Sequence, residues 1–583
     1  MNKHSARRLV ATGAAAAAGA LYLLAARATP VGAAEDDALH ILLARSLRHG
    51  AFAFPDGTPA NDPLPGFAAL LSLPAAAVAP HWDLLKIIGL LSAAATVYLT
   101  WRLARRFLDE GWALAAAALV ALNPLTVTHA GLILPDLPYL ALSLFLFDRM
   151  LEPGFAGAPL IAAAAAASLL RPFGAWLILS LALGIAAAKG ARKALAFALP
   201  ALLPLALWSL RNRLLTGAAS GYFLNMRAES AALAEPRIAL LHAGGLLAAM
   251  GGDGLLSLGN LLPLKGLIAA GAACGALAVI GAVRVLRRKP DPRAFAIGAY
   301  AIIVSAQHLV WMPLEARYVL PLLPLAWIMI LAELAPRLRG KNAPALLFAL
   351  LALPAVPLDL ALAAPGLTQT ARFQPGTMSW LRENTPPGAR VQTLEPQTVT
   401  LLSGRAADLP GFDSAARDAW LAWTLRQRFD YVHVAATFVP GGFFSPAMGF
   451  TASHLGPWAR STPYAREVFR NDAEGTSVFL IRHPDPERYL KAWSAFVSAS
   501  VTLRRGGTAA AARADLDRAI ALEPGLALAW AYRGLLTADP RERRRLLEKA
   551  AALDPTSELI RNELTGASGS PKQPVSSLLR SPL

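Results

Sequence analysis

Residues 35–67 read EDDALHILLARSLRHGAFAFPDGTPANDPLPGF, the first long stretch of the chain that is too polar for a membrane interior. It opens with three consecutive carboxylates, Glu35, Asp36 and Asp37. Residues 38–49 carry apolar side chains at helical spacing, which predicts an amphipathic helix whose apolar side is formed by Leu39, Leu42, Leu43 and Leu47. The prolines and glycines of residues 55–66 predict a loop. We expect this helix to lie in the membrane interface, with the acids where a first span leaves the bilayer.

The composition of the whole chain is that of a polytopic membrane protein. Of its 583 residues, 55% are hydrophobic and only 16% are charged, whereas a soluble chain carries about a quarter charged residues. The net charge is +17, but most basic residues flank hydrophobic runs, as the positive-inside rule requires, so no nucleic-acid partner is expected. The single cysteine, Cys274, lies in an apolar run, which excludes disulfides and cysteine-based metal sites.

Hydrophobic runs long enough to cross a bilayer predict about eleven spans in residues 1–364, with Lys and Arg clusters at alternate turns. The first run, residues 9–26, is either a retained span or a signal peptide cleaved near Ala34. Residues 27–83 are expected to form an outer segment with interfacial helices. Residues 211–265 are less hydrophobic and are expected to form a second outer loop.

Residues 365–490 have ordinary charge and several Pro/Gly turns, which predicts a soluble α/β domain. Strands are expected at Val391–Val399 and Tyr431–Val434, and a helix at Ser414–Arg428. An odd number of spans from an inner N-terminus would place this domain outside. The chain would then be a multi-pass protein of a bacterial cytoplasmic membrane with a periplasmic C-terminal domain.

Residues 491–565 contain an internal repeat, because Ala519-Ile-Ala-Leu-Glu-Pro524 recurs as Ala550-Ala-Ala-Leu-Asp-Pro555. The repeat, together with Trp530 and Gly534, indicates a tetratricopeptide-like helical segment. Only about two units are visible, and a solenoid usually needs three to bury its core, so these helices are expected to pack on the preceding domain. Residues 566–583 are expected to be disordered.

Several short motifs follow one another along residues 1–480. They are Asp36-Asp37 with the loop that follows, Asn123-Pro124, Leu134-Pro-Asp136-Leu-Pro-Tyr139, Arg171-Pro172, Arg211-Asn212, Arg317-Tyr318-Val-Leu-Pro321 and Trp380-Leu-Arg-Glu-Asn-Thr-Pro-Pro-Gly388. In their order and topological placement they resemble the GT-C membrane glycosyltransferases. The similar branch is the glycosyltransferase family 39-like one of protein O-mannosyltransferases and lipid A aminoarabinose transferases.

This resemblance implies a polyprenyl-phosphate sugar donor and transfer of the glycosyl group to an acceptor hydroxyl on the outer face. Transfer needs a base for the acceptor proton, and a positioned base typically contributes about 10²–10⁴-fold in rate. Asp36 takes the leading place of the family's Asp-Glu pair and is the predicted base, with Asp37 as the second candidate. The alternative is that both acids only mark the end of a span.

Asp136 stands between two prolines at an expected outer span end, where it would position the acceptor or hold a divalent cation together with Asp36. A plain helix-start carboxylate is the alternative. Arg171 and Arg317 are the predicted donor-phosphate ligands, because a guanidinium binds phosphate bidentately. Arg211 is the third candidate, and for all three the alternative is an anchor that reaches for lipid headgroups. The sequence identifies no cofactor, and a divalent metal cation is left open.

The sequence leaves two alternative functions open. An outer-face polysaccharide polymerase or ligase would use similar lipid-linked substrates, and a transporter or lipid flippase would share the membrane-embedded body. The glycines at 244–254 lack the lysine and the strand–turn–helix context of a nucleotide-binding loop, so ATP-driven transport has no support. The sugar, the lipid, glycan or protein acceptor, and the oligomeric state are not encoded in any motif.

Overall fold

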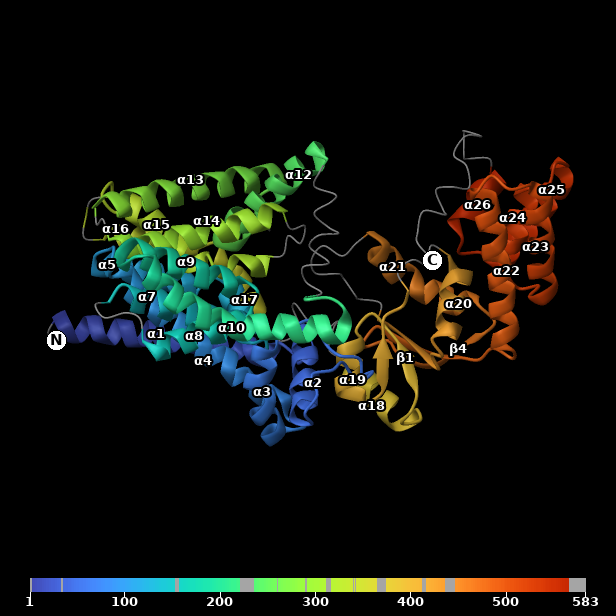
Figure 1. Ribbon diagram of the computed structural model, residues 1–583, viewed down its shortest axis with the longest axis horizontal. Helices are drawn as coiled ribbons and strands as arrows, with labels where there is room; N and C mark the ends of the chain where they lie inside the picture. Colours follow the sequence, from blue (N-terminus) through green and yellow to red (C-terminus); the bar gives the residue numbers. More distant parts are fainter. Residues whose placement is uncertain are drawn as a thin grey trace. The chain divides into compact units, whose positions relative to one another are not determined.

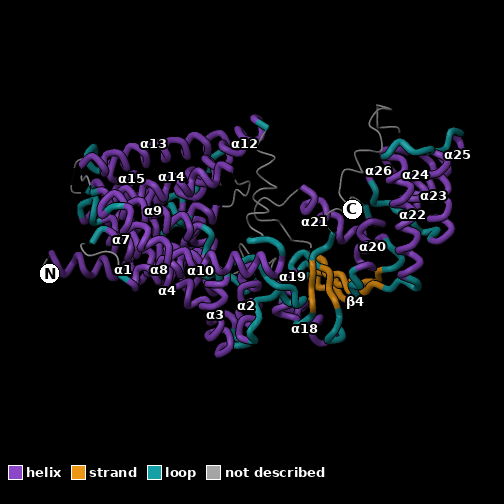
Figure 2. The backbone as a smooth tube through the Cα atoms, viewed as in Figure 1, coloured by secondary structure: helices purple, strands orange, loops and turns teal. Residues whose placement is uncertain are grey.

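The computed structural model describes residues 3–32, 35–152, 157–220, 235–258, 261–288, 291–310, 316–338, 340, 342–363, 374–411, 416–435 and 446–565. The chain divides into two compact units, residues 1–370 and 371–583. Figure 1 follows the elements of each unit along the chain. In Figure 2 the described part of the first unit is helical, and the strands lie in the second unit.

Most helices of the first unit begin at, or directly after, a proline, a glycine or a charged residue. In order they are α1 (Lys3–Ala28), α2 (Asp36–Arg48), α3 (Pro65–Val78), η1 (Trp82–Leu85), α4 (Lys86–Ala104), α5 (Glu110–Ala121), α6 (Pro124–Ala130), α7 (Asp136–Met150), α8 (Ala158–Leu170), α9 (Phe173–Lys189), α10 (Ala191–Thr216), α12 (Pro236–Leu247), η3 (Ala248–Leu255), α13 (Leu264–Arg288), η4 (Pro292–Ala294), α14 (Phe295–Val310), η5 (Ala316–Val319), α15 (Leu323–Leu334), α16 (Ala343–Ala352) and α17 (Ala355–Ala363).

Three helices of the described chain are long and apolar enough to cross a membrane, namely Trp82–Ala104, Ala191–Thr216 and Leu264–Arg287. Two bent pairs raise this number to five if each pair is one span: α5 with α6, bent by 57°, and α16 with α17, bent by 52°. The described chain also contains shorter apolar helices of 10–17 residues. The total of about eleven spans remains a prediction.

Two expectations for the first unit are wrong in detail. Of the residues 211–265 that are expected to form a loop, residues 211–216 continue α10 and residues 236–255 are helical, while residues 221–234 and 259–260 lie outside the described residues. The basic residues at the end of α10 were interpreted as loop residues, although long side chains can keep their charge in a polar setting while their stems stay on a helix.

The buried face of α2 also differs from the expected leucine side. Its centre is Asp37, His40, Ile41 and Ala44, at helical spacing. Of the four leucines expected on the buried side, Leu43 is fully buried, and Leu39, Leu42 and Leu47 are only half-buried. The small Ala44 lets α2 approach α3 closely, so the polar His40 is covered as well. Apolar periodicity alone does not detect a buried stripe that contains an acid and a histidine.

The second unit contains a five-stranded sheet of order β2-β1-β3-β5-β4. The strands are β1 (Arg390–Gln392), β2 (Ala406–Asp408), β3 (Tyr431–Ala435), β4 (Ala465–Asn471) and β5 (Thr476–Ile481). β2, β1 and β3 are parallel, β5 pairs antiparallel with β3, and β4 pairs antiparallel with β5. Helices α18 (Pro375–Asn384) and α19 (Pro396–Ser403) cover one face of the sheet. Helices α20 (Arg417–Arg426) and α21 (Pro446–Ser461) contribute to the core on the other face.

The predicted α/β character and the strand at Tyr431–Val434 are therefore confirmed, and α20 lies within the predicted helix. The single strand expected over Val391–Val399 is wrong, because β1 ends at Gln392 and α19 begins at Pro396. Proline at the first helical position fits a helix start, and that signal outweighs the β-branched residues that follow it.

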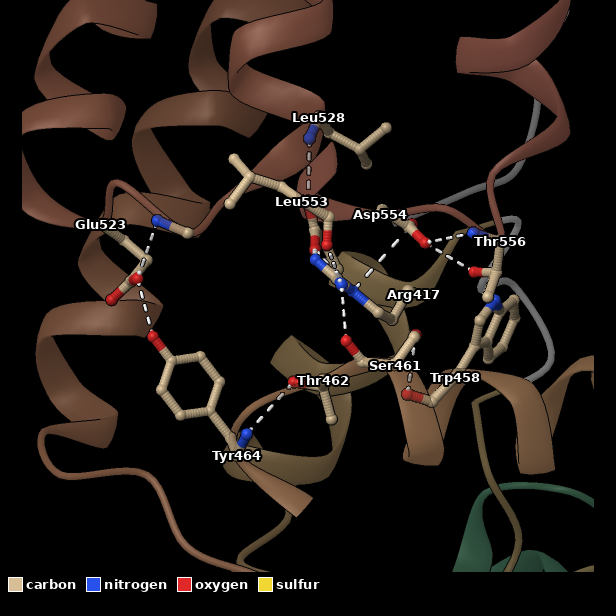
Figure 3. A network of polar contacts seen from close by, with 12 residues as sticks. Arg417, Trp458, Ser461, Thr462, Tyr464, Glu523, Leu528, Leu553, Asp554 and Thr556 are labelled. Atoms are coloured by element: carbon tan, nitrogen blue, oxygen red, sulfur yellow. Dashed lines mark hydrogen bonds and ion pairs between the residues drawn. The ribbon is translucent and has the colours of Figure 1, made fainter. Parts of the chain in front are cut away.

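Five helices complete the second unit: α22 (Pro486–Arg504), α23 (Ala509–Leu522), α24 (Ala527–Leu535), α25 (Pro540–Leu553) and α26 (Glu558–Thr565). The two sequence repeats end α23 and α25, so Glu523 and Asp554 occupy equivalent turns. Figure 3 shows how these turns meet the rest of the unit: the Arg417 guanidinium donates to Leu553 O, and Tyr464 Oη donates to Glu523 Oε1 at 2.9 Å. Sheet and helices also share one apolar core around Trp420, Trp458 and Tyr489.

Candidate functional site

The acidic start of α2 is the first part of the candidate site. Asp36 is the first residue of the helix, and its side chain is 44% exposed. Acids in a first helical turn are stabilised by the free backbone N–H groups and the positive end of the helix dipole. Arg317 Nη1 donates to Asp36 Oδ2 at 2.7 Å, which joins residues 281 positions apart in the chain.

The break between α8 and α9 provides the second pair. Arg171 precedes Pro172, and a residue before proline is biased to extended backbone, so α8 ends and Arg171 adopts φ −144° and ψ 147°. The Arg171 guanidinium pairs with the carboxylate of Asp136, the first residue of α7. Asp136 is 4% exposed, and its Oδ2 accepts no hydrogen bond among the residues described.

An aromatic ring joins the two pairs. The guanidinium of Arg171 lies 5.8 Å from the centroid of the Tyr318 ring, and that of Arg317 lies 5.3 Å from it. Two cations over one ring are held near each other by cation–π attraction, and the two carboxylates offset their mutual repulsion. The ring of Tyr318 in turn packs against Phe173 and His308. The structure thus brings together Asp36, Asp136, Arg171 and Arg317.

His40 is the member that sequence reasoning missed, and Tyr318 was quoted in a motif without a role. His40 follows Asp36 by four residues on α2, which is the spacing that could have pointed to it. Its ring meets Phe67 edge-on at 5.0 Å and is 4% exposed. Burial lowers the pKa of His40 to about 4, and the charges of Asp36, Arg171, Asp136 and Arg317 all act on its imidazole. His40 is therefore a neutral imidazole beside the two ion pairs at ordinary pH.

Asp37, the second candidate base, contacts the backbone around the start of α2. It is 1% exposed, and its carboxylate accepts the backbone N–H groups of Gly32 and Ala38, each at 2.9 Å. Burial raises the pKa of Asp37 to about 6, against the opposing effect of these two hydrogen bonds. Its contacts fix the turn before α2, and within the described residues none reaches the two ion pairs.

Arg211 also lies apart from the ion pairs. Its guanidinium donates to Ala60 O at 2.6 Å and to Phe52 O at 2.9 Å, and it lies 4.6 Å from the centroid of the Trp208 ring. The adjacent Asn212, fully buried, donates to Asn61 O at 3.2 Å. The end of α10 therefore clamps the loop between α2 and α3, and Arg211 does not reach the predicted phosphate ligands through any described contact.

The described residues of this site do not fit the divalent cation that the sequence analysis left open for Asp36 and Asp136. Across the described ranges, no three His, Cys, Asp or Glu side chains converge in a way that could hold a metal ion. Asp36 and Asp136 each face a guanidinium, and a cation in either place would meet that positive charge. We assign no step to a metal.

An apolar groove of about 690 Å³ lies in the first unit. It is lined by residues of α3, α4, α7 and α8, namely Gly66, Leu70, Ser92, Leu99, Pro138, Ala141, Leu142, Phe145, Ala166, Leu169 and Leu170. Leu170 immediately precedes Arg171, and Pro138 lies two residues after Asp136. Two residues that line the groove are thus close in the chain to the ion-paired Arg171 and Asp136.

Comparison with solved structures finds relatives of the fold. The structure of ArnT from Cupriavidus metallidurans bound to undecaprenyl phosphate superposes with a TM-score of 0.50 at 11% identity, over 82% of this chain and 99% of that one. The apo form of the same protein gives 0.49 at 12% identity, over 82% and 100% of the two chains.

The archaeal oligosaccharyltransferase AglB from Archaeoglobus fulgidus, in complex with an inhibitory peptide and a dolichol-phosphate, gives a TM-score of 0.44 at 14% identity, over 68% of this chain. This chain spans 65% of the length of that AglB chain. No family model and no curated protein sequence matches the chain. The similarity is one of fold alone, and it extends over about four fifths of this chain in the comparison with ArnT.

Proposed function

We propose that this chain is a membrane glycosyltransferase that moves a sugar from a polyprenyl-phosphate donor to an acceptor hydroxyl on the outer face of the cytoplasmic membrane. The observation that carries the proposal is the arrangement of Asp36–Arg317 and Asp136–Arg171 over Tyr318, with an apolar groove in the same unit. A polyprenyl phosphate has the matching parts, an anion at the end of a long apolar chain. The undecaprenyl phosphate bound by ArnT is a compound of this class.

In this proposal Arg171 and Arg317 bind the donor phosphate, and the prenyl chain follows the groove. Guanidinium groups form charge-assisted hydrogen bonds to phosphate, and such bonds are stronger where water is sparse. As the bond between the anomeric carbon and the phosphate oxygen breaks, the phosphate keeps the electron pair, and the two arginines stabilise its growing charge.

Asp36 receives the proton of the acceptor hydroxyl as the acceptor oxygen bonds to the anomeric carbon. Its side chain is 44% exposed and pairs with Arg317, so the base lies next to a phosphate ligand and remains accessible. A phosphate on Arg317 would compete for its N–H groups and leave the Asp36 carboxylate available to the acceptor. Asp136 orients Arg171, because their ion pair is almost fully buried.

The charges at the other end of the helices support an outer position for the site. Arg102 and Arg106, at the end of α4, pair with Asp148, which lies twelve residues after Asp136 on α7. A helix rises about 1.5 Å per residue, so these two ends of α7 lie about 18 Å apart. In this proposal the arginine-rich end is cytoplasmic, as the positive-inside rule favours, and Asp136 lies on the outer side.

The test uses the purified chain in vesicles with polyprenyl-phosphate-linked pentose and hexose and a lipid extract as acceptor. We expect labelled sugar to leave the donor and free polyprenyl phosphate to accumulate. Arg171→Gln and Arg317→Gln should each lower transfer about 100-fold or more, since one preorganised donor to a developing charge is worth that much. Arg213→Gln, an exposed arginine of α10, is the matched control and should leave transfer unchanged.

Two results would decide against this function. Movement of the labelled lipid across the vesicle membrane without any glycosyl product would identify a flippase. Growth of a glycan chain by repeated addition would identify the polymerase alternative.

A further inference from the structure

Asn123 stands at the bend between α5 and α6, and its side chain forms hydrogen bonds on two sides. Its Oδ1 accepts the backbone N–H of Leu125 at 3.0 Å, which caps the first turn of α6. Its Nδ2 donates to Gly254 O at 2.9 Å and to Leu255 O at 3.4 Å. Because an N–H lies on one side of the amide and carbonyls lie on the other, the orientation of the amide is fixed. The side chain is buried, so water does not compete for these hydrogen bonds.

The two carbonyls belong to the last turn of η3, which is a π-helix. The wide turn is seen in the hydrogen bond from Leu256 N to Gly251 O, five residues back, at 3.2 Å. Turns of this kind are rare and are frequent at functional sites. The end of a helix leaves carbonyls without an N–H partner inside the helix, and Asn123 supplies the donor from 131 positions earlier in the chain.

The same turn of η3 packs against η5, the segment that contributes one guanidinium and the aromatic ring of the candidate site. A Cβ atom added to Gly254 would lie 3.2 Å from Val319 Cγ2, so the backbone of this glycine touches the last residue of η5. Leu255 and Tyr318 are both buried and belong to one apolar core. Gly254 therefore carries both the carbonyl that Asn123 holds and the surface that supports η5.

We propose that Asn123 is a positioning residue of the glycosyltransferase site, and that through η3 it fixes the segment that presents Arg317 and Tyr318 to the donor phosphate. Its hydrogen bonds go to backbone groups, so it acts through η3 and not by binding the substrate. A displacement of about 1 Å that starts far from the chemistry can lower a rate about 100-fold. The role in catalysis rests on the function proposed above, whereas the contacts between Asn123, η3 and η5 do not.

The competing role of Asn123 is that of a helix cap, which would stabilise α6 and leave η5 unaffected. Serine separates the two roles, because it caps a helix about as well as asparagine but lacks the amide group that reaches η3. Asn123→Ser therefore keeps the hydrogen bond to Leu125 N and removes the link to Gly254 and Leu255.

The experiment is hydrogen–deuterium exchange of the full chain in detergent, followed by mass spectrometry of peptides that cover residues 316–322. The amides of Leu320 and Leu322 donate to Arg317 O at 3.2 Å and to Val319 O at 2.8 Å, so their exchange reports on the order of η5. We expect Asn123→Ser to raise the exchange rate in this segment about tenfold, the effect of losing one hydrogen bond.

The control for this variant is Thr100→Val in α4. It removes a buried hydrogen bond from Thr100 Oγ1 to Thr96 O at 2.7 Å and leaves the shape of the side chain unchanged. The exchange rate of residues 316–322 should stay at its original value in Thr100→Val. This result would show that the effect of Asn123→Ser is not a general response to a lost hydrogen bond in the first unit.

A second variant changes the contact between η3 and η5 from the other side. In Gly254→Ala the new Cβ would lie 2.7 Å from Ala249 O and 3.2 Å from Val319 Cγ2, so η3 has to shift against η5. Exchange in residues 316–322 should rise in this variant as well. Gly275→Ala in α13 is the matched control, because a Cβ there meets no described atom within 4 Å, and it should exchange like the original chain.

The consequence for catalysis is measured in the vesicle transfer assay, where Asn123→Ser should lower kcat/KM for the polyprenyl donor about tenfold or more. The positioning role is overturned if Asn123→Ser leaves the exchange rate of residues 316–322 unchanged, or if that rate rises while transfer stays at the original rate. An original chain that transfers no sugar would contradict the proposed function instead, and the exchange rates would still decide whether Asn123 holds η5.

Discussion

At the scale of single residues, two neighbouring aspartates have opposite surroundings. Side chains one position apart on a helix point about 100° apart, so Asp36 faces Arg317 while Asp37 faces the backbone of the preceding turn. The sequence could show that acids stand here, but not which of them is exposed, because that depends on contacts 281 residues away. His40 was missed for the same reason, since a buried neutral histidine leaves no mark in a hydropathy pattern.

Asp37 should make the stability of the protein depend on pH in a defined direction. Its pKa is raised to about 6 in the folded state, from an ordinary value of 3.8, so the folded chain holds this proton more tightly than the unfolded chain. Stability from this group is present below pH 4 and is lost as the pH rises to about 6. We expect the Tm of the original chain to fall across this window, and that of Asp37→Asn to fall less.

The measurement is thermal unfolding of the detergent-solubilised chain between about pH 4 and pH 7. Asp56→Asn, in the exposed loop after α2, is the control and should show the slope of the original chain. Equal slopes for the original chain and Asp37→Asn would contradict the assignment.

At the scale of elements, some helix ends follow from local chemistry and others depend on long-range contacts. The break at Arg171-Pro172 belongs to the first kind, because proline restricts the residue before it, whatever the surroundings. The end of α10 was missed because charged residues there were assigned to a loop. The structure explains them through Arg211, whose hydrogen bonds join the helix end to residues 52 and 60. No local signal reveals such a partner.

Arg211→Ala should loosen the loop between α2 and α3. The change removes two hydrogen bonds from a charged donor to backbone carbonyls, worth about 1.5–3 kcal/mol each before compensation by water. We expect faster proteolytic cleavage within residues 52–61, measured by mass spectrometry of the fragments. Arg213→Ala changes an exposed residue two positions further along the helix and should leave the cleavage rate unchanged. Equal cleavage rates for the two variants would contradict the role of Arg211 in holding the loop between α2 and α3.

The apolar groove gives a second prediction at this scale. Ala141 on α7 and Ala166 on α8 line it, and a phenyl ring at either place would fill part of its volume. Ala141→Phe and Ala166→Phe should raise the KM for a long-chain polyprenyl donor about tenfold and affect a short-chain donor much less. Ala94→Phe, at an exposed position of α4 outside the groove, is the control. A KM that rises equally for both donors would show that the chain does not lie there.

At the scale of the whole molecule, the second unit is one body in which the sheet and the helical repeats share a core. The two copies of the sequence repeat end in equivalent turns, at Glu523 and Asp554. Both turns take part in the polar contacts drawn in Figure 3. Arg417 is 3% exposed and lies between Asp418 and Asp554, with Leu553 O and Ser461 O as further acceptors. The sequence predicted that the helices pack on the domain, but the ion pairs that join them come from distant positions.

Asp554→Ala should destabilise this unit strongly. It leaves the buried Arg417 with one carboxylate fewer and removes the acceptor of Thr556, and breaking a buried pair typically costs about 3–5 kcal/mol. Chemical denaturation followed by tryptophan fluorescence measures the loss. Glu548→Ala removes an exposed pair with Arg544 and should cost less than about 1 kcal/mol. Similar costs for the two variants would contradict the role given to the buried network.

The most direct test of the proposed function compares Asp36→Asn with Asp37→Asn in the vesicle transfer assay. These substitutions are isosteric, adjacent and on the same helix, and the structure gives only Asp36 an ion pair with Arg317. We expect Asp36→Asn to lower the rate of glycosyl transfer about 10²–10⁴-fold, as the loss of a positioned base does, and Asp37→Asn to stay within about threefold of the original rate once stability is matched. Glycosyl transfer that survives in Asp36→Asn and is lost in Asp37→Asn would contradict the assignment of Asp36 as the base. Unchanged transfer in both variants would show that neither aspartate takes part in the reaction.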